Sequence, residues 1–216
     1  SRCLGKAMST DKRIAELGLK LPKPAAPVAA PQYFPDFITN HVHNPLGFVD
    51  AGAYNGDTLA EARRHLPLRE AWAFEPDPAN FPLLAERARS LSAPVTCLPC
   101  GVSSVNASLS FSGGHGEAST LGGEGNSHIQ VLRLDDCLPN ARVDYLKLDV
   151  EGHEMEALTG AEALIRRNRP ILAIAGYHRR DDLWRIPAWI TQLGLDYRLR
   201  FRIHAHNSFD AVFYAY

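Results

Sequence analysis

From Phe48 to the end of the chain, short apolar runs alternate with segments of helical periodicity. In the helical segments, apolar residues recur three and four positions apart, as they do on one face of an α-helix. This alternation is typical of a parallel sheet that is covered by helices on both faces. The predicted strands are Gly47–Ala51, Ala71–Glu75, Val95–Val102, Tyr145–Val150 and Ile171–Ala175, and the predicted helices are Thr58–His65, Ala79–Leu91, Glu154–Arg167 and Leu183–Leu193.

Two parts of the chain depart from simple alternation. The last apolar runs, Tyr197–Ile203 and Ala211–Tyr216, are separated only by HAHNSFD, which predicts an antiparallel hairpin. A Gly/Ser-rich stretch, Gly113–His128, lies between two β-like pieces, Leu109–Phe111 and Ile129–Leu132. A loop of this kind inside a compact domain is more often functional than decorative, although its composition also fits simple mobility.

The N-terminal region has a different pattern. A short helical segment around Asp11–Leu19 precedes LPKPAAPVAAP, whose prolines favour an extended, polyproline-like path. We therefore expect residues 1–46 to form a helical and proline-rich arm, and residues 47–216 to form one globular domain.

Composition restricts the class of partner. The chain has 216 residues, 45% of them hydrophobic, and a formal net charge of -1. This charge gives no global field that would attract a nucleic acid or an anionic membrane, so the expected partner is a small molecule or a neutral glycan. No stretch approaches the roughly 18 consecutive apolar residues of a membrane span, and no secretory leader is visible. We expect a cytoplasmic protein.

The cysteines include a C-x-x-C pair, Cys97 and Cys100. Such a pair can be a redox motif or half of a zinc site. Both residues fall in the apolar run Pro94–Val102, where cysteine usually behaves as a small buried hydrophobe, and no second pair stands at zinc-site spacing. Burial is therefore the favoured interpretation.

The most informative local motif is FVDAGAYNGDT, Phe48–Thr58, in which an apolar strand leads through Gly52 and Gly56 into a helix. Glycines at such a turn let the backbone approach a ligand closely. Tyr54 stands where a dinucleotide fingerprint requires its second glycine, so a ligand without phosphates fits better. Asp50 and Glu75 end the first two strands, where their carboxylates can bind an amine or ribose hydroxyls, or merely cap the element that follows.

Four segments in order resemble the motifs of FkbM-type methyltransferases, and the similarity extends from Phe48 to the C-terminus. These are FVDAGAYNGDT, FEPDPANF, LDD at Leu134–Asp136 and LKLDVEGHEMEALTGA at Leu146–Ala161. The resemblance implies a Rossmann-like class I methyltransferase fold, which is a mostly parallel sheet with helices on both faces and a C-terminal antiparallel hairpin. It also implies transfer of a methyl group from S-adenosylmethionine to a hydroxyl of a sugar or natural-product scaffold.

Carried over by position, the resemblance implies a set of cofactor-binding residues. Asp50, Gly52 and Gly56 would line the methionine and ribose, Glu75 would hold the ribose, and Asp149 with Glu151 would lie beside the methyl group. The expected cofactor-binding residues are Asp50, Gly52, Ala53, Tyr54, Gly56, Glu75, Pro76, Gly101 and Asp149. The sequence departs from the pattern in PCGVSS, which lacks an adenine-contacting acid, and at Ala175–Gly176, where many relatives have an acid.

A hydroxyl acceptor must lose its proton, which requires a general base or a metal. The segment LDVEGHE supplies Asp149, Glu151 and His153 as catalytic candidates. A carboxylate or histidine base is favoured over a metal, because no compact set of ligands is evident in the sequence, although Asp149 and Glu151 are hard oxygen ligands. Tyr177, His178 and His204 are the expected substrate-binding residues.

Two other functions remain open. An NAD-dependent oxidoreductase shares the strand, glycine turn and later acid, but the missing fingerprint glycine argues against it. A non-catalytic binding or scaffold protein would keep the fold and lose turnover.

Overall fold

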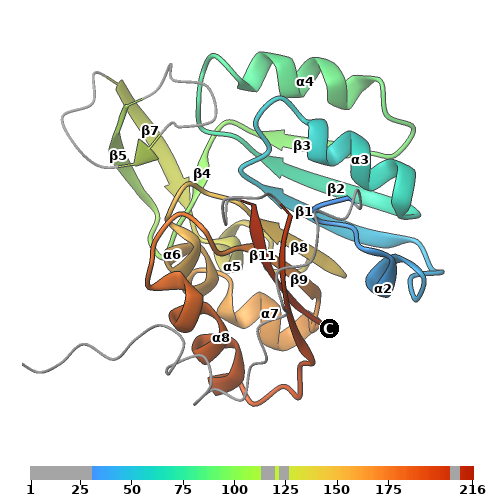
Figure 1. Ribbon diagram of the computed structural model, residues 1–216. Helices are drawn as coiled ribbons and strands as arrows, with labels where there is room; N and C mark the ends of the chain where they lie inside the picture. The colour runs from blue at the N-terminus through green and yellow to red at the C-terminus, as the bar shows by residue number, and fades with distance from the viewer. Residues whose placement is uncertain (1–30, 113–119, 122–126, 205–209) are drawn as a thin grey trace, which may run out of the picture.

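The computed structural model describes residues 31–112, 120–121, 127–204 and 210–216. Its central sheet has the strand order β10-β11-β9-β8-β1-β2-β3 (Figure 1). Strand β11 runs antiparallel to both of its neighbours, β10 and β9, and it forms the predicted hairpin with β10. The strands are β1 (Leu46–Ala51), β2 (Leu68–Phe74), β3 (Val95–Leu98), β8 (Tyr145–Leu148), β9 (Ile171–Ala175), β10 (Leu199–Ile203) and β11 (Ala211–Ala215). The predicted class of fold is confirmed.

Helices cover both faces of this sheet because side chains of successive strand residues point to opposite sides. Phe48 and Tyr145 pack with side chains of α2, α3 and α4, whereas Val49 and Leu146 pack with side chains of α5, α6, α7 and α8. The bounds of the first group are α2 (Asp36–Thr39), α3 (Asp57–His65) and α4 (Phe81–Arg89). Those of the second group are α5 (Leu134–Cys137), α6 (Glu154–Thr159), α7 (Glu162–Asn168) and α8 (Asp182–Gln192).

A second, smaller sheet corrects the prediction of one strand over Val95–Val102. The chain turns at Pro99, where the Cys100 amide donates to the Leu98 carbonyl at 2.9 Å. Proline has no amide hydrogen to extend the first ladder, and the chain after this turn joins the second sheet. Its order is β4-β7-β5-β6, with β4 (Gly101–Val102), β5 (Ala107–Ser112), β6 (Thr120–Leu121) and β7 (Ser127–Leu132). Most of the Gly/Ser-rich stretch, 113–119 and 122–126, lies outside the described residues.

The predicted helix Glu154–Arg167 is divided into α6 and α7 at Gly160. A Cβ atom at Gly160 would lie only 1.9 Å from the Ser103 carbonyl oxygen, so glycine is required for this close approach. The Gly160 carbonyl accepts a hydrogen bond from the Asp135 amide at 2.9 Å instead of continuing the helix. The Asp135 carboxylate in turn accepts the Leu164 amide at 2.7 Å, which satisfies a free donor at the start of α7.

Part of the predicted N-terminal arm belongs to the packed core. Tyr33, Phe34 and Ile38 are at most 4% exposed, and they pack against the α3 and α4 side of the sheet. The Phe34 ring lies 5.9 Å from the ring of Phe48 and 5.7 Å from that of Tyr145. The structure thus places the start of the packed domain before residue 47, whereas the predicted helix around Asp11–Leu19 lies outside the described residues.

Two further expectations concern the C-x-x-C pair and membrane-spanning segments. Cys97 and Cys100 are free cysteines, and burial raises the pKa of Cys100 to about 12, which keeps this thiol neutral. Within the described segments, no helix has the length and apolar character needed to cross a membrane.

Truncating Phe34 tests whether the segment before β1 stabilises the domain. Phe34→Ala should lower the free energy of unfolding by about 3–5 kcal/mol, because it leaves a cavity among buried aromatic rings. Val105→Ala is the matched control, since Val105 is 50% exposed and its truncation should cost little. Urea unfolding of both variants gives the comparison, and equal stability of the two would contradict a packing role for this segment.

Candidate active site

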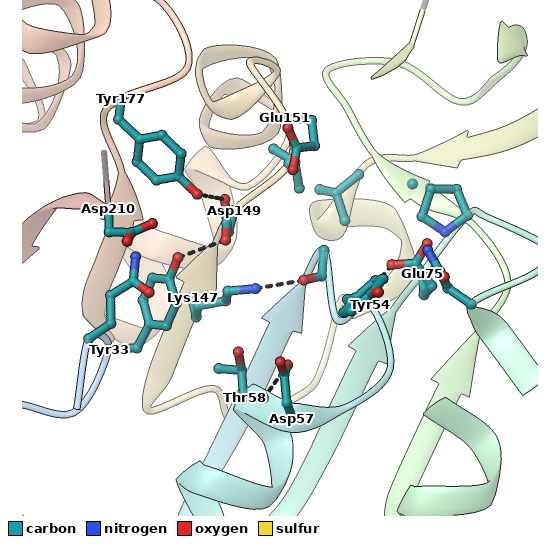
Figure 2. Close-up of a pocket in the computed structure, with 17 residues that line it drawn as sticks. Tyr33, Tyr54, Asp57, Thr58, Glu75, Lys147, Asp149, Glu151, Tyr177 and Asp210 are labelled. Carbon is teal, nitrogen blue, oxygen red and sulfur yellow. Dashed lines mark hydrogen bonds between the residues drawn. The ribbon is translucent and has the colours of Figure 1, made fainter. Parts of the chain in front are cut away.

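A cleft opens at the carboxyl ends of β1, β2 and β8 (Figure 2). Strand order reverses between β1 and β8, since the chain continues from β1 to β2 on one side and from β8 to β9 on the other. In open α/β sheets, ligands bind at this position. The empty space between its walls is about 1050 Å³, including the part that is open to solvent. The lining residues are Gln32, Tyr33, Gly52, Tyr54, Asp57, Thr58, Glu75, Pro76, Asn80, Gly101, Val102, Lys147, Asp149, Val150, Glu151, Tyr177 and Asp210.

The turn at Gly52 holds the three strand ends together. Gly52 has a φ of +77°, and a Cβ atom there would lie 1.7 Å from the Asp149 carbonyl oxygen. Its amide donates to the Phe74 carbonyl of β2 at 3.0 Å, and the Asp149 amide donates to the Ala51 carbonyl at 3.1 Å. Only glycine allows this conformation and this close approach.

Glu75 presents a fixed carboxylate on one side of the cleft. Its Oε2 accepts the Tyr54 amide and its Oε1 accepts the Asp77 amide, each at 2.8 Å. Burial raises the pKa of Glu75, and these backbone hydrogen bonds oppose that shift. Pro76 and Gly101, which the sequence suggested as cofactor contacts, also line the cleft. The carboxylate oxygens keep lone pairs for further donors from a ligand.

Asp149 lies on the other side of the cleft, between two tyrosines. Tyr33 donates its hydroxyl to Oδ2 at 2.7 Å, and Tyr177 donates to Oδ1 at 3.3 Å (Figure 2). Burial raises the pKa of both tyrosines, and the charge of Asp149 adds to the rise, so both hydroxyls stay protonated donors. Asp149, Glu151 and Tyr177, which are candidates from the sequence, thus all line the cleft.

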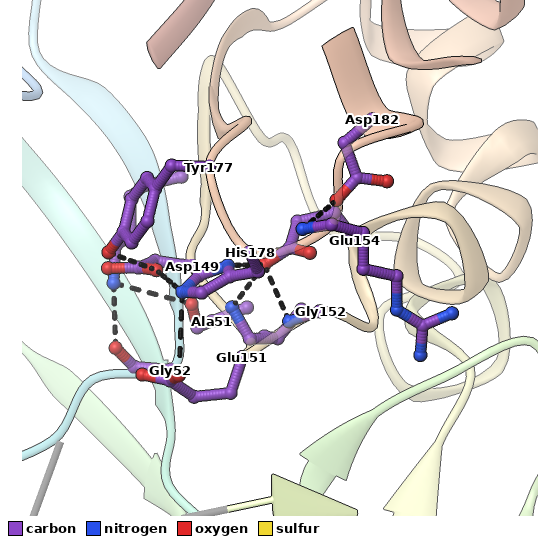
Figure 3. Close-up of polar contacts among 12 residues, drawn as sticks. Ala51, Gly52, Asp149, Glu151, Gly152, Glu154, Tyr177, His178 and Asp182 are labelled. Atoms are coloured by element: carbon purple, nitrogen blue, oxygen red, sulfur yellow. Dashed lines mark hydrogen bonds and ion pairs between the residues drawn. The ribbon is translucent and has the colours of Figure 1, made fainter. Parts of the chain in front are cut away.

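His178 lies behind these residues, next to Asp149, Glu151 and Glu154 (Figure 3). Its Nδ1 is 2.8 Å from Oε1 of Glu154, a carboxylate that is fully buried. Burial opposes a charge on His178, but the hydrogen bond to Glu154 and the neighbouring carboxylates raise its pKa above the ordinary value. The ring is therefore held next to Asp149 and Glu151 but is not among the residues that line the cleft, although the sequence predicted it to bind the substrate.

Asp50 does not reach the cleft, which corrects the expectation that it contacts the methionine. Its side chain is 0% exposed and forms an ion pair of 3.0 Å with Nζ of Lys147. The reason is strand alternation, because Asp50 and Lys147 are register partners on β1 and β8 and point to the same face as Phe48. Burial raises the pKa of Asp50 against the opposing effect of Lys147.

Besides Asp50 and His178, four predicted site residues lie outside the cleft lining. Ala53 is buried in the core at 1% exposure, and Gly56 precedes α3 close to Leu84 of α4. His153 precedes α6, so the helix start carries it past the cleft. His204 has its Nε2 2.8 Å from the Tyr214 hydroxyl, and burial lowers its pKa.

The structure adds residues that the sequence reasoning missed, notably Tyr33, Lys147 and Asp210. Lys147 had a visible signal, because a lysine within the buried apolar run YLKLDV requires a partner. Tyr33 had a weaker one in the aromatic segment QYFPDF, which the proline-rich arm precedes. Asp210 gave none, since its place depends on how the final hairpin packs.

Removing Lys147 tests the ion pair. Lys147→Met should lower the free energy of unfolding by about 3–5 kcal/mol, because the Asp50 carboxylate would remain buried without its counter-charge. Replacing both partners, by Asp50→Val with Lys147→Met, should cost less than the sum of the two single changes. Urea unfolding of the three variants measures this coupling, and additive costs would show that the pair does not act as a unit.

Asp182 predicts a dependence of stability on pH. Burial and the Glu154 charge raise its pKa from 3.8 to about 6, against a hydrogen bond from the Arg179 amide. Its contribution to stability is therefore full below pH 3.8 and is lost as the pH rises through about 6. Asp182→Asn, which keeps an acceptor for Arg179, should gain stability relative to the wild type between about pH 4 and about pH 7. Urea unfolding at both pH values measures the free energy of unfolding of the variant and of the wild type. The same difference between the two proteins at both pH values would refute this prediction.

Comparison with known proteins identifies relatives of the chain. A family model described as the methyltransferase FkbM domain matches residues 50–202. The hexuronic acid methyltransferase AglP of Haloferax volcanii is 34% identical over 121 residues, which are 51% of the chain and 49% of that protein. The crystal structure of methyltransferase FkbM from Methylobacillus flagellatus is similar with a TM-score of 0.71 at 26% identity, over 88% of the chain and 48% of that protein.

A more distant likeness concerns the fold alone. Fibrillarin of Aeropyrum pernix, solved with natively bound S-adenosyl-L-methionine, is similar with a TM-score of 0.51 at 11% identity, over 83% of the chain and 72% of that protein. The chain spans about half the length of the two relatives named first, the proteins from Haloferax and Methylobacillus.

Proposed function

The chain belongs to the FkbM methyltransferase family, and we propose that it transfers a methyl group from S-adenosylmethionine to a hydroxyl of a sugar or a related small molecule. The observation that carries this proposal is the pairing of Glu75 and Asp149 on the two sides of one cleft at the strand reversal (Figure 2). One side suits a ribose, and the other suits a positively charged sulfur with its acceptor. The Gly52 turn lies between them.

The charges of the cleft fit a cationic ligand. Its carboxylates are Asp57, Glu75, Asp149, Glu151 and Asp210, against the single cation Lys147 among the lining residues. Lys147 already pairs with Asp50, so the cleft has a surplus of negative charge. This surplus would attract a sulfonium and disfavour the pyrophosphate of NAD, which agrees with Tyr54 at the position of a fingerprint glycine.

The fixed geometry of Glu75 supports its role in holding ribose hydroxyls. Two backbone amides orient the carboxylate before a ligand arrives, so little ordering is needed on binding. When bound, S-adenosylmethionine supplies a methyl group that its positive sulfur has activated. The chain then has to align the acceptor hydroxyl and exclude water.

The acceptor would lie beside Asp149, Glu151 and Tyr177. The two carboxylates can accept the hydroxyl proton, and Tyr177 can orient Asp149 through its hydrogen bond. His153, which the sequence suggested as a base, lies outside the lining, so Asp149 and Glu151 are the better candidates. The name of the Haloferax relative, a hexuronic acid methyltransferase, supports a carbohydrate acceptor.

Calorimetric titration of the purified protein with S-adenosylmethionine, S-adenosylhomocysteine and NAD tests the cofactor. We expect saturable binding of the first two with one site per chain, followed by methyl transfer to hydroxylated sugars in a radiolabel assay. Binding of NAD alone would favour the oxidoreductase alternative. Cofactor binding without transfer to any hydroxylated sugar would favour the non-catalytic alternative.

Glu75→Ala tests the ribose assignment. The variant should bind S-adenosylhomocysteine about tenfold to a hundredfold more weakly, because it loses charge-assisted hydrogen bonds worth about 1.5–3 kcal/mol. Glu86→Ala is the matched control, since Glu86 is exposed on α4 outside the cleft. Equal affinity of Glu75→Ala and the control, with both variants folded by circular dichroism, would exclude a role for Glu75 in cofactor binding.

A further inference from the structure

Three side chains of types that commonly bind metal ions lie close together behind the acceptor end of the cleft. Asp149, Glu151 and His178 each offer one ligand atom, and these atoms all lie within 4.8 Å of one another. They come from separate segments, because Asp149 and Glu151 follow β8 whereas His178 follows β9 (Figure 3). All three residues were candidates from the sequence, but His178 was expected to bind the substrate and was not associated with the two carboxylates.

The unpartnered Nε2 atom of His178 is the observation that points to a ligand. The side chain is only 10% exposed, and Nε2 is buried without a hydrogen-bond partner. It lies 3.5 Å from Oδ1 of Asp149 and 3.4 Å from Oε2 of Glu151. If Nε2 donated a hydrogen bond, it would be expected to lie about 2.8 Å from one of these two carboxylate oxygens. Its nearly equal distances to both oxygens instead leave room for an ion between the three atoms.

Glu154 determines which ring nitrogen of His178 is free. Its Oε1 accepts hydrogen bonds from the Val150 amide at 3.0 Å and the Gly152 amide at 3.4 Å, and it lies 2.8 Å from Nδ1 of His178. A carboxylate that accepts these bonds requires a proton on Nδ1. When the ring is neutral, the lone pair of Nε2 then faces Asp149 and Glu151. Metal-binding histidines are oriented by a carboxylate in this way.

We propose that Asp149, Glu151 and His178 bind a divalent cation at the acceptor end of the cleft. Ligand atoms at about 2.1–2.2 Å from a cation lie roughly 3 Å apart when they are adjacent in an octahedron, so small shifts of these side chains would complete the site. Two carboxylates suit Mg²⁺ and Mn²⁺, and the imidazole favours a transition metal. Mn²⁺ therefore fits this mixed set best.

The surroundings of the three ligands support this assignment. Tyr33 and Tyr177 fix the orientation of Asp149 through their hydroxyls. Glu151 has a φ of +53°, a conformation that residues other than glycine rarely adopt and that is concentrated at functional sites. Asp210 adds a further carboxylate to the same end of the cleft, so a bound cation would also offset repulsion among the acids.

The catalytic consequence rests on the proposed function, whereas binding of the ion does not. Three protein ligands leave positions of an octahedral ion open to water or to an acceptor. An alcohol oxygen at such a position would lose its proton more easily, as water does on a bound metal. This would let a neutral sugar hydroxyl react, with a neighbouring carboxylate of the cleft accepting its proton.

Mn²⁺ binding tests the site directly. Purified protein without cofactor is titrated with MnCl₂, and free Mn²⁺ is followed by electron paramagnetic resonance. We expect one bound ion per chain, with spin-echo modulation from one imidazole nitrogen. Glu151→Gln should weaken binding about tenfold or more by removing a charged ligand, whereas Glu162→Gln, which alters an acid paired with Arg166 outside the lining, should not.

Two results would overturn the proposal. One is the absence of Mn²⁺ binding at millimolar concentration, with nitrogen NMR showing a proton on both ring nitrogens of His178. The other is stoichiometric binding that Glu151→Gln and Asp149→Asn leave unchanged. Titration with S-adenosylhomocysteine on the same samples separates the two proposals, because failure to bind it contradicts the methyltransferase and leaves the ion site standing.

Discussion

The buried ammonium group of Lys147 joins the ends of the two central strands. Its Nζ lies 3.0 Å from the Asp50 carboxylate, and it donates to the carbonyl oxygens of Gly52 at 2.6 Å and Ala51 at 3.4 Å. These contacts connect β8 to β1 and to the turn that follows it. A charge in this dry environment needs all of its partners. The position of Asp149, only two residues further along the chain, therefore depends on the same contacts.

The segment before β1 links stability to the site. The Tyr33 ring lies over Lys147, with its centroid 5.2 Å from Nζ, and its hydroxyl binds Asp149. Its carbonyl accepts a hydrogen bond from the Tyr145 hydroxyl, which ties this segment to the sheet. One tyrosine thus covers the buried ion pair and orients the carboxylate at the acceptor end. A boundary placed at residue 47 separates the site from one of its walls.

The sequence predicted the central sheet well because its inner strands β1, β8, β9 and β11 are buried on both faces and consist largely of apolar residues. Ile171–Ala175 has the predicted bounds, and the final hairpin lies where its spacing indicated. The errors arose where an apolar or helical pattern continues through a break. Pro99 and Gly160 gave local signals, but each break is completed by distant contacts, such as Gly160 with Ser103 and Asp135. No local pattern reveals such contacts.

The position of a residue relative to its strand also decides which site residues could be found from the sequence. Glu75 and Asp149 directly follow their strands, where a side chain is free to enter the cleft. Asp50 stands one residue before the end of β1, so strand alternation turns it toward Lys147. His178 follows β9, which lies beside β8 in the sheet, and this adjacency brings its ring to Asp149. The choice between His153 and His178 therefore depends on strand order, which links residues that the sequence separates.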